Sequence, residues 1–138
     1  MKKLGSLIRV HRWRVDEARR KLAGLEKLAD ELRGRAGALD AEVEGEKRGA
    51  GRDYELGRFY GAYAQFAVER RNRLARSLAE LQVEIAAARD ALAAAFEELK
   101  RYETTAERQL RAEAAEEARA EQARFDDVGL SRHRRGAA

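Results

Sequence analysis

The stretch LARSLAELQVEIAAARDALAAAFEELKRYETTA, residues 74–106, decides the fold. Apolar or small residues recur along it at alternating spacings of four and three, which are the a and d positions of a coiled-coil helix. The stretch therefore predicts a long helix with one narrow apolar stripe, the seam, that packs on a partner helix. Its seam positions are Leu74, Leu78, Leu81, Ile85, Ala88, Leu92, Ala95, Leu99, Tyr102 and Ala106.

A second run with the same spacing precedes it, and only His11 interrupts its apolar character. The two runs match in an antiparallel register in which opposing residue numbers sum to 103, from Leu4 with Leu99 to Ala29 with Leu74. This register sets alanine against a larger residue in four of eight pairs, as tight layers require. We therefore predict an all-α fold: two long helices forming an antiparallel coiled-coil hairpin. The first run is Leu4, Ile8, His11, Val15, Ala18, Leu22, Leu25, Ala29, Leu32, Ala36, Leu39 and Val43.

We expect a single coiled-coil domain over residues 1–138. The first helix spans about residues 4–48, the turn about 49–52, the second helix about 53–128, and a basic tail 129–138. Asp53 is suited to cap the second helix at its N-terminus, and Gly129 to end it. Because the first helix is shorter, residues 100–128 are left as a C-terminal helical overhang.

Five of the nine aromatic residues lie between Tyr54 and Phe66. We expect Phe59, Tyr63 and Phe66 to continue the seam, and Tyr54 and Tyr60 to lie off it. The cluster either staples the tip of the hairpin or forms an exposed docking patch. Beyond it Arg70 occupies the seam before Leu74, and this spacing predicts a stutter that locally unwinds the supercoil.

Composition excludes several classes of protein. Charged residues make up 39% of the chain and aromatic residues 7%, with no proline and no cysteine, a composition typical of long helices. The absence of cysteine excludes disulfides and thiol chemistry and agrees with a reducing compartment. No stretch approaches the ~18 apolar residues of a membrane span, so we expect a cytoplasmic protein without direct membrane insertion.

No catalytic constellation is present in the sequence. His11 and His133 lie at opposite ends of the chain, and no phosphate-binding glycine loop occurs. We therefore predict that the protein is not an enzyme and has no catalytic residues, no cofactor and no metal site. His11 is interpreted as a polar core residue facing Leu92.

Charge is distributed unevenly along a chain of net charge +4. Residues 1–21 hold eight basic residues against two acids, whereas residues 97–127 hold ten acids against six bases. Trp13 falls opposite the seam, between two arginines, where a contact anchor is expected. The candidate partner-binding residues are Arg9, Arg12, Trp13, Phe59, Tyr60, Tyr63, Phe66, Arg124 and Phe125.

Three stretches resemble the flagellar type III export protein FliJ family. They are the basic heptad start from Leu7 to Ala23, the motif Tyr63-Ala64-Gln65-Phe66, and Glu121-Gln122-Ala123-Arg124-Phe125-Asp126-Asp127 before a basic tail. The resemblance spans the whole chain. The sequence departs from the family at three positions. The family often has a basic residue where this chain has Ala123, and it usually has an apolar residue where this chain has Arg70. The third is Gly129, which is expected to shorten the final helix.

The resemblance implies a coiled-coil stalk, peripherally located at the membrane-associated flagellar export apparatus. Family members insert their terminal end into the hexameric export ATPase ring, promote its assembly and activity, and contact the export gate membrane protein and export chaperones. By position, Phe66 is a gate-contact candidate, and Arg124 and Phe125 are ring-contact candidates.

The sequence features also allow other functions to be considered. A coiled-coil stalk or adaptor of a virulence type III secretion system has the same sequence features. A nucleic-acid-binding coiled coil is suggested by the pI of about 9.6, but basic and acidic residues alternate along most of the chain, so we expect no nucleic-acid partner. A membrane-surface helix requires a broader apolar face than this seam. The overhang also makes self-association possible.

Overall fold

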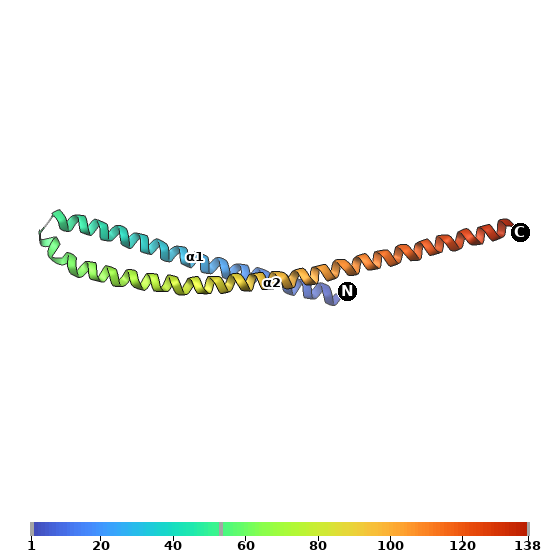
Figure 1. The fold of residues 1–138 in the computed structure, drawn as a ribbon, viewed down its shortest axis with the longest axis horizontal. Helices are drawn as coiled ribbons and strands as arrows, with labels where there is room; N and C mark the ends of the chain where they lie inside the picture. Colours follow the sequence, from blue (N-terminus) through green and yellow to red (C-terminus); the bar gives the residue numbers. More distant parts are fainter. Residues whose placement is uncertain (1, 53, 138) are drawn as a thin grey trace. The chain divides into compact units, whose positions relative to one another are not determined.

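The protein, described here from a computed structural model, is entirely helical over the described residues, 2–52 and 54–137. Helix α1 spans Lys2–Arg52 and helix α2 spans Tyr54–Ala137, and the two pack against each other as a helical hairpin (Figure 1). The chain divides into two compact units. We call Arg14–Ala95 the hairpin unit and Met1–Trp13 with Phe96–Ala138 the terminal unit.

Burial follows the predicted heptads. Every residue of the two predicted seam runs is buried or half-buried. The core is thin because each helix buries only one stripe, so few residues are nearly inaccessible to solvent. They include Val15 at 3%, Ala29 at 1% and Leu39 at 5% exposure. The coiled-coil prediction is confirmed.

The register of the hairpin unit, however, differs from the predicted one by a heptad. Ala29 lies in one buried cluster with Leu81 and Ile85. The numbers of Ala29 and Leu81 sum to 110, as do those of Leu25 and Ile85, whereas the predicted register gave 103. The half-buried residues packed against the cluster are Leu22, Leu25, Leu32 and Leu78.

Two ion pairs between the helices require the same shift. The Arg89 guanidinium lies 3.3 Å from the Glu26 carboxylate, and that of Arg71 lies 3.2 Å from Asp40. In the 103 register these partners would be displaced by about 18 Å and about 12 Å along the helices, which is beyond the reach of their side chains. The predicted register is therefore wrong by seven residues.

The shifted register has a packing reason. A slip of one heptad keeps the same faces together, so the heptad pattern alone does not choose between the two registers. In the 110 register alanine opposes a larger residue in seven layers and never opposes another alanine, which fills the interhelical space more evenly. These layers are Leu4–Ala106, Val15–Ala95, Ala18–Leu92, Leu22–Ala88, Ala29–Leu81, Ala36–Leu74 and Val43–Ala67.

At the tip, α1 continues through the expected turn to Arg52, and α2 begins at Tyr54. The predicted cap, Asp53, lies outside the described residues. Phe59 and Phe66 are 74% and 51% exposed, so the prediction that they continue the seam is wrong. Between residues 59 and 67 of α2, the half-buried or buried residues are Tyr60, Tyr63, Ala64 and Ala67.

The predicted stutter is also absent from the described structure between residues 60 and 74. Arg71, rather than Arg70, reaches across to α1, at Asp40. Positions 60, 64, 67, 71 and 74 then keep the alternating spacing of four and three. Arg71 occupies a seam position because its long side chain places the charge at the solvent-exposed edge of the coiled coil.

In the terminal unit, His11 is 7% exposed, and its ring stacks on that of Tyr102 with centroids 4.5 Å apart. The prediction that His11 is a core residue is confirmed, but its neighbour is Tyr102 rather than Leu92. Half-buried side chains end at Ala106, and every side chain from residue 107 to 136 is exposed. The uncovered helix thus begins seven residues later than predicted, because of the register shift.

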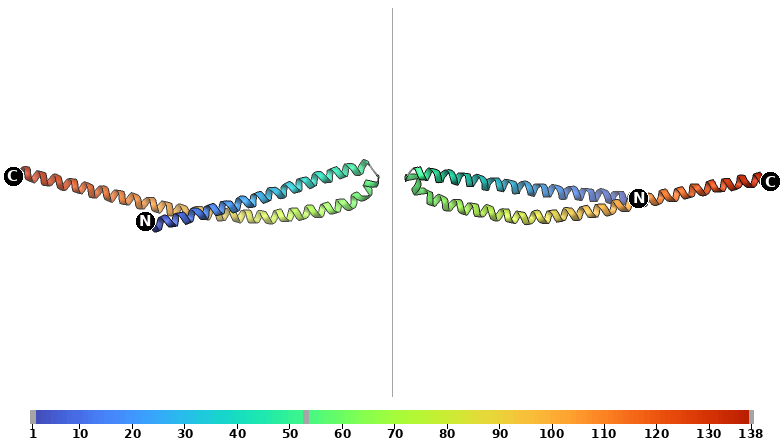
Figure 2. Two further views of the ribbon diagram at one scale, coloured as in Figure 1. Left: turned by 180° about the vertical axis from the view of Figure 1, so that it is seen from behind. Right: turned by 45° about the horizontal axis from the view of Figure 1, so that its top comes forward.

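This uncovered part of α2, residues 107–137, is called the C-terminal segment. Figure 2 shows it running on past the N-terminus of α1. It remains helical through Gly129 to Ala137, so the prediction of a helix end at Gly129 and a separate tail is wrong. A glycine cap requires a positive φ, and no glycine in the described residues has one.

Candidate partner-binding surfaces

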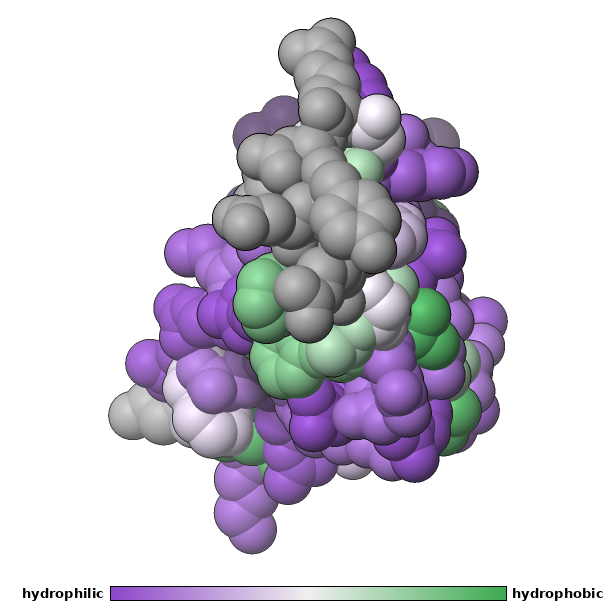
Figure 3. Space-filling model, turned by 90° about the vertical axis from the view of Figure 1, so that its left-hand side faces the viewer, coloured by the Kyte–Doolittle hydropathy of each residue, from purple (hydrophilic) through white to green (hydrophobic). Residues whose placement is uncertain are grey.

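The hairpin unit presents a tip surface made by Phe59 and Phe66. The two residues are seven apart in α2 and therefore lie on the same helix face, and both are exposed. Viewed from the tip, hydrophobic side chains gather within a mostly hydrophilic surface (Figure 3). Of the two readings of the aromatic cluster, the exposure of these phenylalanines favours the docking patch over a tip staple.

Tyr60 and Tyr63 do not belong to this exposed surface. Tyr60 and Tyr63 are half-buried on the seam side of α2. The Tyr63 hydroxyl oxygen is buried and has no hydrogen bond of good geometry among the described residues. Burial raises the pKa of Tyr63, and the neighbouring Glu42 and Glu46 carboxylates raise it further, against a smaller lowering by Arg70. The structure therefore makes Tyr63 part of the helix packing rather than of the tip surface.

The terminal unit carries an N-terminal surface on α1. Arg9 and Arg12 are exposed, and Trp13 is 62% exposed, as its position opposite the seam predicts. Sequence reasoning missed Leu7 and Val10, which are 42% and 45% exposed beside these residues. Their signal was the spacing of three from Leu7 to Val10 to Trp13, which marks a second apolar stripe on α1.

The C-terminal segment carries the third surface. Arg124 is exposed and Phe125 is 66% exposed. Together with Glu121 and with Val128, which is 50% exposed, they line a shallow groove. Val128 is one turn of helix beyond Arg124, and sequence reasoning did not select it.

The structure does not bring the N-terminal and C-terminal surfaces together. Residues 2–13 lie beside the part of α2 that ends at Ala106, and Arg124 lies eighteen residues further along. At the rise of an α-helix this is about 27 Å. The candidate residues of the terminal unit therefore form two separate surfaces rather than one site.

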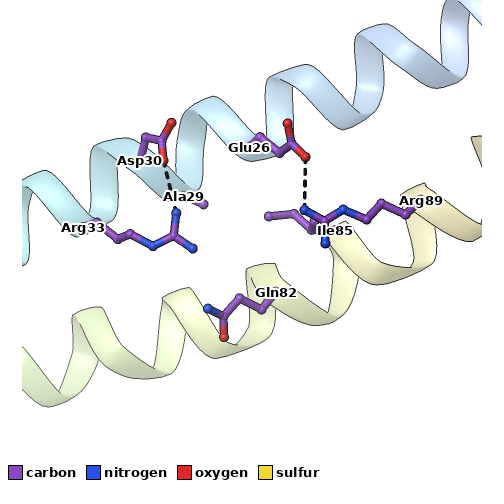
Figure 4. A pocket seen from close by; sticks show the side chains of 7 residues that line it. All are labelled: Glu26, Ala29, Asp30, Arg33, Gln82, Ile85 and Arg89. Atoms are coloured by element: carbon purple, nitrogen blue, oxygen red, sulfur yellow. Dashed lines mark hydrogen bonds and ion pairs between the residues drawn. The ribbon is translucent and has the colours of Figure 1, made fainter.

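Charged side chains along the hairpin unit neutralise each other. A groove between α1 and α2 contains the Glu26–Arg89 pair, with Arg33 bonded to Asp30 at 3.1 Å beside it (Figure 4). Within the described ranges, no group of three histidine or acidic side chains is placed to hold a metal ion. Nor does any helix in those ranges combine the length and apolar character needed to cross a membrane.

The fold and these surfaces define a class of protein: a helical hairpin with exposed aromatic and basic side chains. Comparison with known proteins specifies it further. The family model described as "Flagellar FliJ protein" matches residues 1–138. A "Flagellar FliJ protein" of Caulobacter vibrioides strain NA1000 / CB15N is 36% identical over 130 residues, covering 92% of this chain and 91% of that protein.

The same protein from Caulobacter vibrioides strain ATCC 19089 matches equally, at 36% identity over 130 residues. No solved structure matches the chain. Because the family model covers the whole length, the chain belongs to the FliJ family. It is thus a coiled-coil component of flagellar protein export, and this is the family that its sequence motifs resemble.

Proposed function

We propose that this protein is the stalk of the flagellar export ATPase: it binds the hexameric ring, promotes ring assembly and activity, and links the ring to the export gate and to export chaperones. The observation that carries the proposal is the C-terminal segment. It is a single helix of about 46 Å, and every side chain from residue 107 to 136 is exposed. One helix, about 10–12 Å wide, is a suitable shape for the central opening of a protein ring.

Arg124 and Phe125 are the proposed anchors of this contact. An arginine beside a large, exposed apolar side chain is typical of interface hot spots, which often contribute ~2 kcal/mol or more to binding. Phe125 and Val128 line the same groove, so a ring subunit can bury both side chains at once.

The tip surface is the proposed site for a different partner. Phe66 and Phe59 expose apolar area at the opposite end of the α2 sequence, and we assign Phe66 to the export gate. The N-terminal surface, with Arg9, Arg12 and Trp13, has the charge to contact an acidic protein surface. The protein would then act in the cytoplasm, peripherally at the export apparatus.

The test is ATP hydrolysis by the purified cognate ATPase with and without this protein. The double variant Arg124→Glu, Phe125→Ala should bind the ring at least tenfold more weakly, because it loses a hot-spot pair. Its stimulation of hydrolysis should fall accordingly, while its helical content stays unchanged. Phe66→Ala is the matched control and should stimulate normally but bind the gate less well. Normal stimulation by the double variant would show that the C-terminal segment does not contact the ring.

A further inference from the structure

The C-terminal segment has one face with a distinctive order of side chains. Its residues follow spacings of three and four and therefore share a side of α2. Two large apolar residues, Phe125 and Val128, lie at the centre of this face and are 66% and 50% exposed. They line a groove together with Glu121 and Arg124. The face comprises Ala118, Glu121, Phe125, Val128 and Arg132.

Charge changes sign along the same segment. Residues 107–127 hold seven acids and four bases, whereas Arg132, Arg134 and Arg135 follow within the last turns of α2. When a second copy of the segment lies antiparallel to the first, its basic end meets the acidic part of the first copy. The basic end of the first copy meets the acidic part of the second in the same way. The segment is therefore complementary to itself in the antiparallel direction only.

We propose that the C-terminal segments of two copies pair antiparallel about a two-fold axis between Phe125 and Val128. In this register Phe125 lies against Val128 of the second copy, and Glu121 lies against Arg132 of the second copy. Two-fold symmetry forms each contact twice. The overlap runs from about residue 116 to the end of α2, about 33 Å of helix in each copy.

The pairing would stabilise this helix by packing its apolar face. Every side chain of α2 from residue 107 to 136 is exposed, so this segment has no tertiary partner among the described residues. A helix in water draws most of its stability from packing an apolar face. Burying two phenylalanines and two valines in one patch, flanked by opposite charges, supplies such packing without contributions from the hairpin unit.

A functional consequence rests on the proposed function. Phe125 and the neighbouring Arg124 are also the residues assigned to the ATPase ring. A segment paired with a second copy has this face covered, so self-association and ring binding exclude each other. The paired form is then a resting state of the free protein that the ring dissociates.

The experiment is sedimentation of the full chain over a range of concentrations, with no ATPase present. Wild-type protein should show a reversible monomer–dimer equilibrium. Glu121→Arg alone, or Arg132→Glu alone, creates two like-charge contacts and should weaken the dimer at least tenfold. The double variant restores opposite charges and should recover the dimer. Residues 121 and 132 are eleven apart in one helix and do not meet within a chain, so this rescue can arise only between copies.

Glu116→Arg and Arg134→Glu are matched controls, because both residues lie on the opposite face of α2. They should leave the dimer unchanged. A wild-type protein that is monomeric at every soluble concentration would overturn the proposal. The proposal would also be wrong if both single variants dimerised as strongly as the wild type. It would be wrong as well if the single variants weakened the dimer and the double variant did not restore it. None of these outcomes involves the ATPase, so the proposed function is tested independently of this dimer.

Discussion

His11 of α1 stacks on Tyr102 of α2, with ring centroids 4.5 Å apart and ring planes 20° apart. A stacked pair cannot tolerate an axial displacement of several residues, so this contact determines which part of α2 lies beside the first turns of α1. It also explains why a histidine sits in a core that is otherwise apolar: its flat ring packs on an aromatic face. Such a pair contributes about 0.5–1.5 kcal/mol beyond the burial of area.

Removing the Tyr102 ring should therefore loosen the start of α1. We expect Tyr102→Ala to destabilise the pairing of residues 2–13 by about 1–2 kcal/mol, because the tyrosine is half-buried. Hydrogen exchange should accelerate at these amides and remain slow around Leu81. Uniform acceleration along both helices would contradict a local role for the stack.

The register can be tested by disulfide formation, since the chain has no cysteine of its own. Cysteines introduced at Ala29 and Leu81 should form a disulfide within one chain, because these positions oppose each other in the same cluster. Cysteines at Leu25 and Leu78, which oppose each other only in the register shifted by a heptad, are the control and should remain reduced. The opposite result, read on a denaturing gel, would restore the register that sums to 103.

The seam should not accept a charge. Leu22 is half-buried and packs against the Ala29 cluster, so Leu22→Asp places a carboxylate in the apolar layer. We expect a loss of several kcal/mol in the free energy of unfolding. Leu28 is 45% exposed on another face of α1, and Leu28→Asp should cost little. Thermal melting followed by circular dichroism distinguishes the two, and similar losses in both variants would contradict the assigned seam.

Tyr63 should be replaceable by phenylalanine without loss of stability. Its buried hydroxyl oxygen has no hydrogen bond of good geometry among the described residues, so Tyr63→Phe removes a desolvated polar group and keeps the ring. We expect a melting temperature equal to or above that of the wild type. A clear decrease would indicate that the hydroxyl is bonded in solution.

The same residue predicts a dependence on alkaline pH. Burial raises the pKa of folded Tyr63 above the ordinary value of 10.0, so its neutral form is favoured by folding. The stability associated with this group is complete below pH 10 and is lost as the pH rises through the folded pKa. Tyr63→Phe should therefore lose less stability than the wild type in urea titrations above pH 10.

The sequence was sufficient for the helical hairpin because its information is periodic. A seam spaced by four and three specifies a helix, the face that it buries and the need for a partner helix, and none of this depends on distant contacts. The exposure of Trp13 and the burial of His11 followed from the same period. The FliJ family was also recognisable from short motifs, which retain their order along the chain.

The same periodicity explains what remained for the tertiary structure to decide. A heptad repeat looks the same after a slip of seven residues, so the choice between sums of 103 and 110 depended on how alanines and large residues fill each layer. Near the tip, phenylalanines and alanines form two competing stripes on α2. Packing placed Ala67 inside and Phe66 outside because a small residue lets the helix backbones approach, and this choice exposed the tip surface.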